Sequence, residues 1–323
     1  MIHDSSNMLE VLDNFPKQCK EALSLPKGIT AQGEITSIVV CGMGGSGIGG
    51  DLLKSCLSNS KLPVFVVKDY KVPEFVDNYT LVFALSYSGN TEETLAAVND
   101  ARAKNANIIA ITTGGELAKL AKKVIKIPSG LQPRCAIGYL FFPMLGILYN
   151  SNLVDIKNAD LNEMLELLNQ QDAIKTKAQE LAKKIQGKTP IIYSSELLKP
   201  VAYRWQTQIN ENAKYPAYHS AFSEMNHNEI NSFRGMDRSR FLPILIRDKN
   251  DHPRIQKRMG ICRQIMERSV DVEEVNVQGS SLLARMFSTI YLGDYVSYYL
   301  AVRERVDPTP VEVIEWLKKQ LAS

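Results

Sequence analysis

Two stretches rich in glycine and hydroxyl side chains carry the residues best suited to binding a phosphate group. The first is Cys41–Gly50 (CGMGGSGIGG), and the second is Ser86–Thr91 (SYSGNT). Each follows an apolar, β-branched run and precedes a helical pattern, so each places backbone N–H groups and the positive end of a helix dipole at a turn. Glycines let the backbone approach a ligand, and hydroxyls add donors: Ser46, Ser86, Ser88 and Thr91. Together they predict one phosphate held from two sides, as in a protein that handles phosphosugars.

The densest polar stretches of the second half contain groups that can move protons on a sugar. They are Gln208–Lys214 (QINENAK) and Ser223–Glu229 (SEMNHNE). A carboxylate such as Glu211 can take a proton from the carbon next to a carbonyl and return it to the neighbouring carbon. An imidazole such as His227 can assist opening of the sugar ring near neutral pH. An ordinary surface carboxylate and a structural histidine remain the alternative interpretation of these two residues.

A third candidate lies in the loop that follows the strand-like run Val124–Ile127. In open α/β sheets, ligands bind at the carboxyl ends of the strands. Arg134 lies in this loop, directly after Pro133, and is therefore a candidate ligand of a phosphate or sugar. A solvated loop arginine is the alternative.

The elements that must position these residues alternate between strands and helices. Apolar strand-like runs occur at residues 35–41, 64–67, 80–85, 108–112, 124–127, 190–193, 241–246 and 270–277. Helical patterns cover residues 4–24, 47–57, 91–104, 117–122, 140–149, 202–212, 255–268, 282–303 and 311–321. This alternation predicts an α/β protein with two doubly wound, flavodoxin-like parallel sheets. We expect one domain over residues 1–152 and a second over 153–323, because residues 151–188 form a polar helical connection.

The composition is that of a soluble globular protein in a reducing compartment. The 323 residues include 45% hydrophobic and 23% charged side chains, and the net charge is +3. The near balance of charge implies neither a nucleic-acid nor a membrane partner. No signal peptide precedes the first domain, and the five scattered cysteines favour the cytoplasm. Neither the cysteines nor the histidines have the spacing of a metal site, so no metal is expected.

The first glycine loop also fits a dinucleotide-binding pattern. Gly42-Met-Gly44-Gly-Ser-Gly47 matches G-x-G-x-x-G, and Asp69 lies where a ribose-binding acid would follow. The hydroxyl cluster at Ser86–Thr91 has no required role in hydride transfer, however, and has a natural one in holding a terminal phosphate. The phosphosugar interpretation is therefore preferred, with a nicotinamide enzyme as the rival.

Taken together, these motifs resemble the sugar isomerase (SIS) domain, and over nearly the whole chain they resemble the bifunctional phosphoglucose/phosphomannose isomerases best known from archaea. The matching segments are Cys41–Gly47, Ala84–Thr91, Ala110–Gly115, Gln132–Arg134, Asn210–Lys214, His227–Asn228 and Leu317–Lys318.

The resemblance implies a homodimer of two-SIS-domain subunits that interconverts an aldose phosphate and a ketose phosphate without a cofactor. Glu211 would be the base, Arg134 would stabilise the enediolate intermediate, and His227 would assist ring opening from the neighbouring subunit. Lys318 would contact the substrate. The phosphate would be held by Gly44, Gly45, Ser46, Ser86, Ser88 and Thr91.

One position departs from the family pattern. Seven residues before Lys318 the family has a threonine linked to the use of mannose phosphate, and here the residue is Val311. Thr309, two positions earlier, is the alternative hydroxyl. A non-catalytic phosphosugar regulator and an amino-sugar phosphate isomerase are the other functions that the sequence leaves open.

Overall fold

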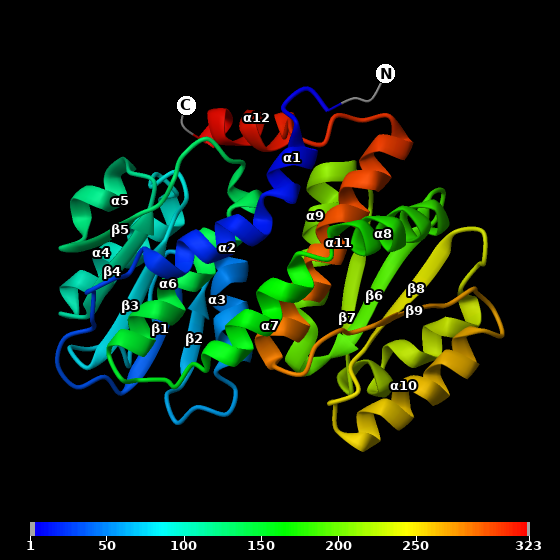
Figure 1. Cartoon of the computed structure of the whole chain (residues 1–323), viewed down its shortest axis with the longest axis horizontal. Coiled ribbons are helices and arrows are strands. Elements are labelled where there is room, and N and C mark those ends of the chain that lie inside the picture. Colours follow the sequence, from blue (N-terminus) through cyan, green and yellow to red (C-terminus); the bar gives the residue numbers. More distant parts are fainter. Residues whose placement is uncertain (1–3, 322–323) are drawn as a thin grey trace. The chain divides into compact units, whose positions relative to one another are not determined.

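The computed structural model describes residues 4–321, which form two parallel β-sheets flanked by helices (Figure 1). The chain divides into two compact units, each with one sheet. The sheet A unit comprises Asn14–Asn169 and Ser280–Ala284. The sheet B unit comprises the chain up to Asp13, Gln170–Gly279, and the chain from Arg285 onward. The domain boundary expected between residues 152 and 153 lies within the segment Asn14–Asn169, which belongs entirely to the sheet A unit.

Sheet A has five parallel strands in the order β2-β1-β3-β4-β5. Their bounds are Ser37–Cys41 (β1), Val64–Val67 (β2), Thr80–Leu85 (β3), Asn107–Thr112 (β4) and Lys123–Lys126 (β5). Every residue of β1 and β3 is buried. Strands covered on both faces lose the alternation of polar and apolar residues, which explains these continuous apolar runs.

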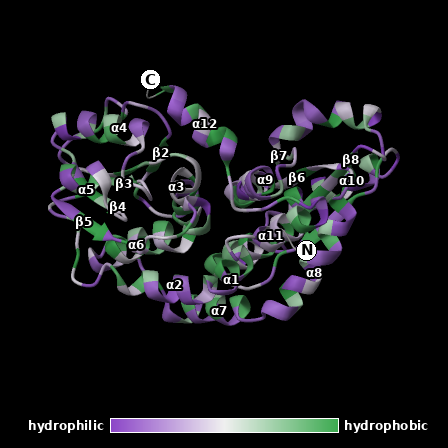
Figure 2. Cartoon of the chain, turned by 90° about the horizontal axis from the view of Figure 1, so that it is seen from above, coloured by the Kyte–Doolittle hydropathy of each residue, from purple (hydrophilic) through white to green (hydrophobic). Residues whose placement is uncertain are grey.

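Helices cover both faces of sheet A. The helices of this unit are α2 (Phe15–Ser24), α3 (Gly44–Cys56), α4 (Glu92–Ala103), α5 (Gly115–Leu120), α6 (Ile137–Asn150) and α7 (Asn158–Leu168), of which α7 packs against α2. In Figure 2, α4 and α6 lie on opposite sides of the strands. The apolar helix α6 packs against α2 and α3, which accounts for the burial of most of its residues.

Sheet B has four parallel strands in the order β7-β6-β8-β9. Their bounds are Thr189–Ser195 (β6), Tyr218–Phe222 (β7), Phe241–Arg247 (β8) and Glu273–Asn276 (β9). The unit also contains α1 (Met8–Asp13), α8 (Gln171–Ile185), α9 (Lys199–Ala213), α10 (Pro253–Met266), most of α11 (Leu282–Glu304) and α12 (Glu312–Leu321). Short 3₁₀ helices occur at Glu196–Leu198 (η2), Glu224–His227 (η3) and Glu229–Gly235 (η4), and another, η1, lies at Pro133–Cys135 in the sheet A unit.

The two doubly wound parallel sheets confirm the predicted fold class, but two local predictions are wrong. The single helix expected over residues 4–24 is two helices, α1 and α2, separated at Asn14. Pro16 lies in the first turn of α2, where a proline starts a helix instead of continuing one. Strand β7 was not predicted, because its residues Tyr218, His219 and Ser220 are exposed or half-buried at the edge of the sheet.

Candidate functional site

The two phosphate-binding candidates lie at the topological switch point of sheet A. From β1 the chain passes through α3 to β2 on one side, whereas β3, β4 and β5 follow on the other. Strands β1 and β3 are paired in parallel, with Cys41 opposite Ala84. The loops that follow them therefore emerge side by side at the carboxyl edge, where open α/β sheets bind their ligands.

The first loop is shaped by glycine. Gly44 has φ +51°, a conformation that side chains other than glycine rarely adopt, and α3 begins at this residue. The first N–H groups of a helix have no partner inside it, and no side chain caps α3. Ser46 N and Gly47 N donate to the carbonyl of Met43 at 3.0 and 3.2 Å, so the N–H groups of Gly44 and Gly45 are the ones at this helix start that suit an anion.

Arg134 is packed directly against this loop. A Cβ atom on Gly45 would lie 3.1 Å from the carbonyl oxygen of Pro133 and 3.2 Å from the Cα of Arg134. Arg134 is only 3% exposed, and its guanidinium donates to Gln132 Oε1 at 3.4 Å. The short helix that carries it is pinned by Gln18, which donates to the carbonyl of Cys135 at 3.0 Å and accepts from Gly138 N at 2.8 Å. The structure thus joins Arg134 to the first loop.

The second loop is closed by its own hydroxyl groups. Ser86 Oγ lies 2.9 Å from Thr91 Oγ1 and accepts from Gly89 N at 3.0 Å. Ser86 is buried, whereas Ser88 is exposed and accepts from Asn90 N at 3.2 Å. The two serines therefore differ: Ser86 holds the turn together, and Ser88 is accessible to a ligand.

The turn between β4 and α5 packs against the second loop and is hydrogen-bonded to it. A Cβ on Gly89 would lie 1.8 Å from the carbonyl oxygen of Gly114, so only glycine fits there. Gly89 O accepts from Leu117 N at 2.9 Å, and Asn90 Oδ1 accepts from Glu116 N at 3.0 Å. These bonds fix the loop to the start of α5.

Sequence reasoning missed one cation beside the first loop. A Cβ on Gly47 would lie 3.0 Å from Cε of Lys68, the residue that follows β2. Lys68 forms an ion pair with Asp51 of α3. The spacing between loop and lysine depends on the pairing of β1 with β2, which no local motif reveals.

The remaining candidates belong to the sheet B unit. Glu211 lies in the last turn of α9 and lines a cavity of about 700 Å³. The other residues that line this cavity include Tyr215, Val306, Val311 and Glu312. Lys214 ends α9 in the left-handed conformation (φ 53°). Its ammonium donates to the carbonyls of Asp307 and Pro308 at 2.6 and 3.1 Å, which holds the segment before α12 against the end of α9.

Buried polar contacts with α11 hold helix α9 in place. Arg204 pairs with Asp294 at 2.8 Å, and Gln208 donates to the same carboxylate at 3.2 Å. Closer to Glu211, Asn212 donates to Ser297 Oγ at 2.9 Å. Buried, hydrogen-bonded pairs of this kind restrict orientation more than they stabilise the fold. They define which face of α9 presents Glu211 to the cavity.

The other candidates of this unit are more exposed. His227 ends η3 and is exposed, as is Lys318 on α12, a helix with no buried residue in its described part. Figure 2 shows both hydrophobic and hydrophilic turns along α12. Val311 lines the cavity beside Glu211, whereas Thr309 is not among the lining residues, and its backbone N–H donates to Asp307 Oδ1 at 2.9 Å.

The switch point of sheet B is filled by an ion pair instead of a glycine loop. Asp248, which follows β8, is buried and pairs with Arg285. Asp251 and Ser195 are buried beside them, and burial raises the pKa of the Asp251 carboxyl. Buried carboxylates repel a phosphate, which agrees with the absence of a second glycine loop from the sequence.

Cys41 is a structural residue. It ends β1, is fully buried, and burial raises the pKa of its thiol to about 12. Among residues 4–321, no group of three or more His, Cys, Asp and Glu side chains could hold a metal ion. No helix in the described part of the chain is long and apolar enough to cross a membrane.

Comparisons with known proteins assign both halves of the chain. Residues 34–173 match the SIS domain model, and residues 174–321 match the model of the bacterial phospho-glucose isomerase C-terminal SIS domain. A bifunctional phosphoglucose/phosphomannose isomerase from Caldicellulosiruptor bescii is 44% identical over 335 residues, covering 98% of this chain and 99% of that protein.

Two further matches are more distant. A D-glucosamine-6-phosphate 4-epimerase from Sulfolobus acidocaldarius is 36% identical, over 74% of this chain and 77% of its own length. The structure of glucosamine-6-phosphate deaminase from Thermotoga maritima has a TM-score of 0.70 at 15% identity, covering 92% of this chain and 96% of that one. The latter likeness concerns the fold alone.

Proposed function

The chain belongs to the family of bifunctional phosphoglucose/phosphomannose isomerases, and on this premise we propose that it interconverts glucose 6-phosphate and mannose 6-phosphate with fructose 6-phosphate. The observation that carries the proposal is the sheet A switch point, where two loops rich in N–H and hydroxyl donors follow adjacent strands and the first of them packs against the buried Arg134. Family membership favours this function over the dinucleotide alternative.

The phosphate is the anchor in this proposal. The N–H groups of Gly44 and Gly45 at the start of α3 and the hydroxyls of Ser46, Ser86, Ser88 and Thr91 bind its oxygens. Ser86 also keeps the second loop closed. A fixed phosphate holds the far end of the sugar, which converts proton transfer into a reaction between positioned groups.

The chemistry requires one base and one stabiliser of negative charge. Glu211 takes the proton from carbon 2 of the open aldose, and the electrons move toward the carbonyl oxygen on carbon 1 to form a cis-enediolate. The proton of the carbon-2 hydroxyl moves to the oxygen on carbon 1, and the protonated Glu211 returns its proton to carbon 1, which gives the ketose. Arg134 stabilises the enediolate oxygens, which carry the developing charge.

The other roles follow from the family. His227 of a second subunit assists ring opening in a homodimer, and Lys318 contacts the substrate. Thr309 is the proposed hydroxyl for mannose recognition in place of Val311, and the position of Val311 beside Glu211 makes that substitution relevant to specificity. Within residues 4–321 no cysteine forms a disulfide, which suits the cytoplasm, and the family's reaction would place the enzyme in glycolysis and gluconeogenesis.

A second candidate is epimerisation of an amino-sugar phosphate, favoured by the 36% identical epimerase. Turnover of purified protein should be compared on glucose, mannose and glucosamine 6-phosphates with EDTA present, by chromatography of the products. Formation of fructose 6-phosphate from the first two supports the isomerase. Selective epimerisation of glucosamine 6-phosphate supports the second candidate, and specific binding without turnover of any of them supports a regulator.

A further inference from the structure

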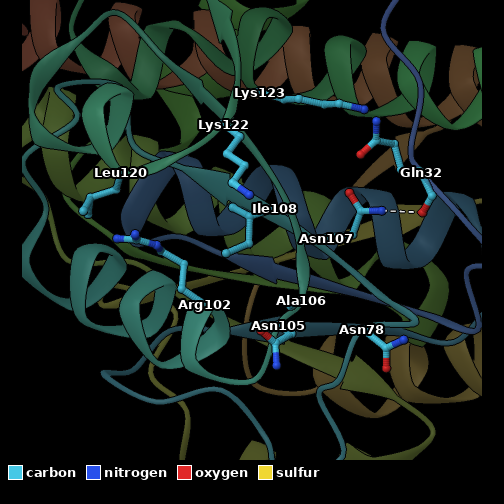
Figure 3. A pocket seen from close by; sticks show the side chains of 10 residues that line it. All are labelled: Gln32, Asn78, Arg102, Asn105, Ala106, Asn107, Ile108, Leu120, Lys122 and Lys123. Carbon is cyan, nitrogen blue, oxygen red and sulfur yellow. Dashed lines mark hydrogen bonds between the residues drawn. The ribbon is translucent and has the colours of Figure 1, made fainter.

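A second pocket lies in the sheet A unit at the amino-terminal ends of the strands, opposite the phosphate loops. It has a volume of about 480 Å³ and is lined where β4 and β5 begin and where α4 and α5 end (Figure 3). All strands of this sheet run in parallel, so this pocket lies at their amino-terminal ends and the phosphate loops lie at their carboxyl ends. None of the candidate site residues discussed above lines it.

The pocket is strongly cationic. Arg102, Lys122 and Lys123 line it, and none of its ten lining residues is an aspartate or glutamate. Three other lysines of this unit are paired with carboxylates, namely Lys68 with Asp51, Lys104 with Glu74, and Lys119 with Glu116. Within residues 4–321, in contrast, the side chains of Arg102 and Lys122 have no hydrogen-bond or ion-pair partner, and Lys123 donates only to the carbonyl of Thr30, at 2.7 Å.

Helix ends do not account for this charge. Basic residues commonly complement the negative C-terminal end of a helix, and both α4 and α5 end at the pocket. Each helix end corresponds to about half a negative charge, so the two together amount to roughly −1. Three cations exceed that charge, which leaves a net positive field available to a ligand.

Neutral groups around the cations would contact the rest of a ligand. Four amide side chains line the pocket, those of Gln32, Asn78, Asn105 and Asn107. Asn107 donates to the carbonyl of Gln32, as Figure 3 shows. Ile108 and Leu120 form an apolar wall. In Figure 3, Lys122 extends toward Ile108, and the guanidinium of Arg102 lies on the side of Leu120.

The three elements that build this pocket also carry the second phosphate loop. Helix α4 begins directly after Thr91 and ends beside Asn105. Strand β4 begins at Asn107 and leads into Thr113, whose hydroxyl donates to the carbonyl of Tyr87 at 2.8 Å. The N–H groups of Glu116 and Leu117 at the start of α5 donate hydrogen bonds to the loop, and Leu120 at the end of this helix lines the pocket. A ligand that orders these elements at the pocket would therefore also affect the order of the phosphate loop at their other ends.

We propose that this pocket binds a small organic polyanion, a metabolite with two or more phosphate or carboxylate groups, as an effector separate from the sugar substrate. Arg102 and Lys122 bind its charged groups, and the amides bind its hydroxyl or carbonyl oxygens. The site goes beyond isomerisation and does not require that activity.

Calorimetric titration at low ionic strength tests the proposal with two probes, pyrophosphate for phosphates and citrate for carboxylates. Four proteins are compared: wild type, Arg102→Ala/Lys122→Ala, the loop variant Ser88→Ala, and Lys183→Ala/Lys257→Ala. The last removes the same charge from exposed positions on α8 and α10. Thermal unfolding checks that each variant is folded.

The proposal predicts that at least one probe binds wild type, the loop variant and the charge control with similar affinity. Removal of the two pocket cations should weaken that binding by about tenfold or more, since charge-assisted bonds are lost. Which probe binds identifies phosphate or carboxylate chemistry. The proposal is overturned if neither probe binds wild type, if the pocket variant binds as wild type does, or if the affinity is lost in Ser88→Ala instead.

Discussion

The backbone of Gly45 in α3 packs closely against that of Arg134 in the helix η1, so that a Cβ atom at position 45 would fit only if its neighbours shifted slightly. This contact brings the buried arginine to the first phosphate loop. An alanine at position 45 would place its Cβ 3.1–3.2 Å from Pro133 and Arg134, closer than usual van der Waals contact.

We therefore expect Gly45→Ala to displace Arg134 and to lower kcat/KM by about one to two orders of magnitude, because electrostatic stabilisation depends on position. Steady-state kinetics with glucose 6-phosphate measures the effect. Gly260→Ala on α10 is the control, since no atom lies within 4 Å of its added Cβ. Equal kinetics for both variants would show that the contact has no part in catalysis.

The two serines of the second loop should respond differently to alanine. Loss of the buried Ser86 hydroxyl breaks the contacts with Thr91 and Gly89 and should lower the free energy of unfolding by about 1 kcal/mol. Loss of the exposed Ser88 hydroxyl should leave stability unchanged and raise KM by about tenfold, because a phosphate contact is lost. Urea unfolding and kinetics of both variants separate the effects. A stable Ser86→Ala protein with unchanged KM would refute the role given to that hydroxyl.

Val311 lies with Glu211 in one cavity, so a hydroxyl introduced there should affect sugar specificity. We expect Val311→Thr to raise the ratio of mannose 6-phosphate to glucose 6-phosphate turnover by about tenfold. Val313→Thr makes the same chemical change in the same cavity and should leave the ratio unchanged. High mannose 6-phosphate turnover by wild type, unaffected by Val311→Thr, would show that another residue serves.

The full burial of Cys41 and the partial burial of Cys56 have a consequence for the pH dependence of stability. Burial raises the pKa of both thiols from 9.0 to about 12, so the folded protein keeps them neutral where the unfolded chain ionises. Their contribution to stability is complete below pH 9 and is lost between pH 9 and 12. At pH 9, iodoacetamide should label both slowly in the folded protein and rapidly in urea, as mass spectrometry can measure. Rapid labelling of the folded protein would contradict this assignment.

The fold was largely predictable because buried parallel strands leave a strong local pattern. Strands β1 and β3 could be predicted from their continuous apolar runs, and the turns after them could be predicted from their glycines. What could not be predicted depends on contacts distant in sequence. The edge strand β7 exists through its pairing with β6, and the placement of Arg134 depends on Gln18, more than a hundred residues earlier. The cavity beside Glu211 likewise depends on Lys214 binding the segment before α12.

The most direct test of the account is the Glu211→Gln variant, which removes the base but keeps the shape of the side chain. Its kcat for glucose 6-phosphate and its dissociation constant for a non-isomerisable analogue, 6-phosphogluconate, should be measured, with Glu180→Gln on α8 as control. The account predicts that kcat falls by about three orders of magnitude while the dissociation constant stays within about threefold of wild type. Turnover within about tenfold of wild type would contradict the assignment of Glu211 as the base.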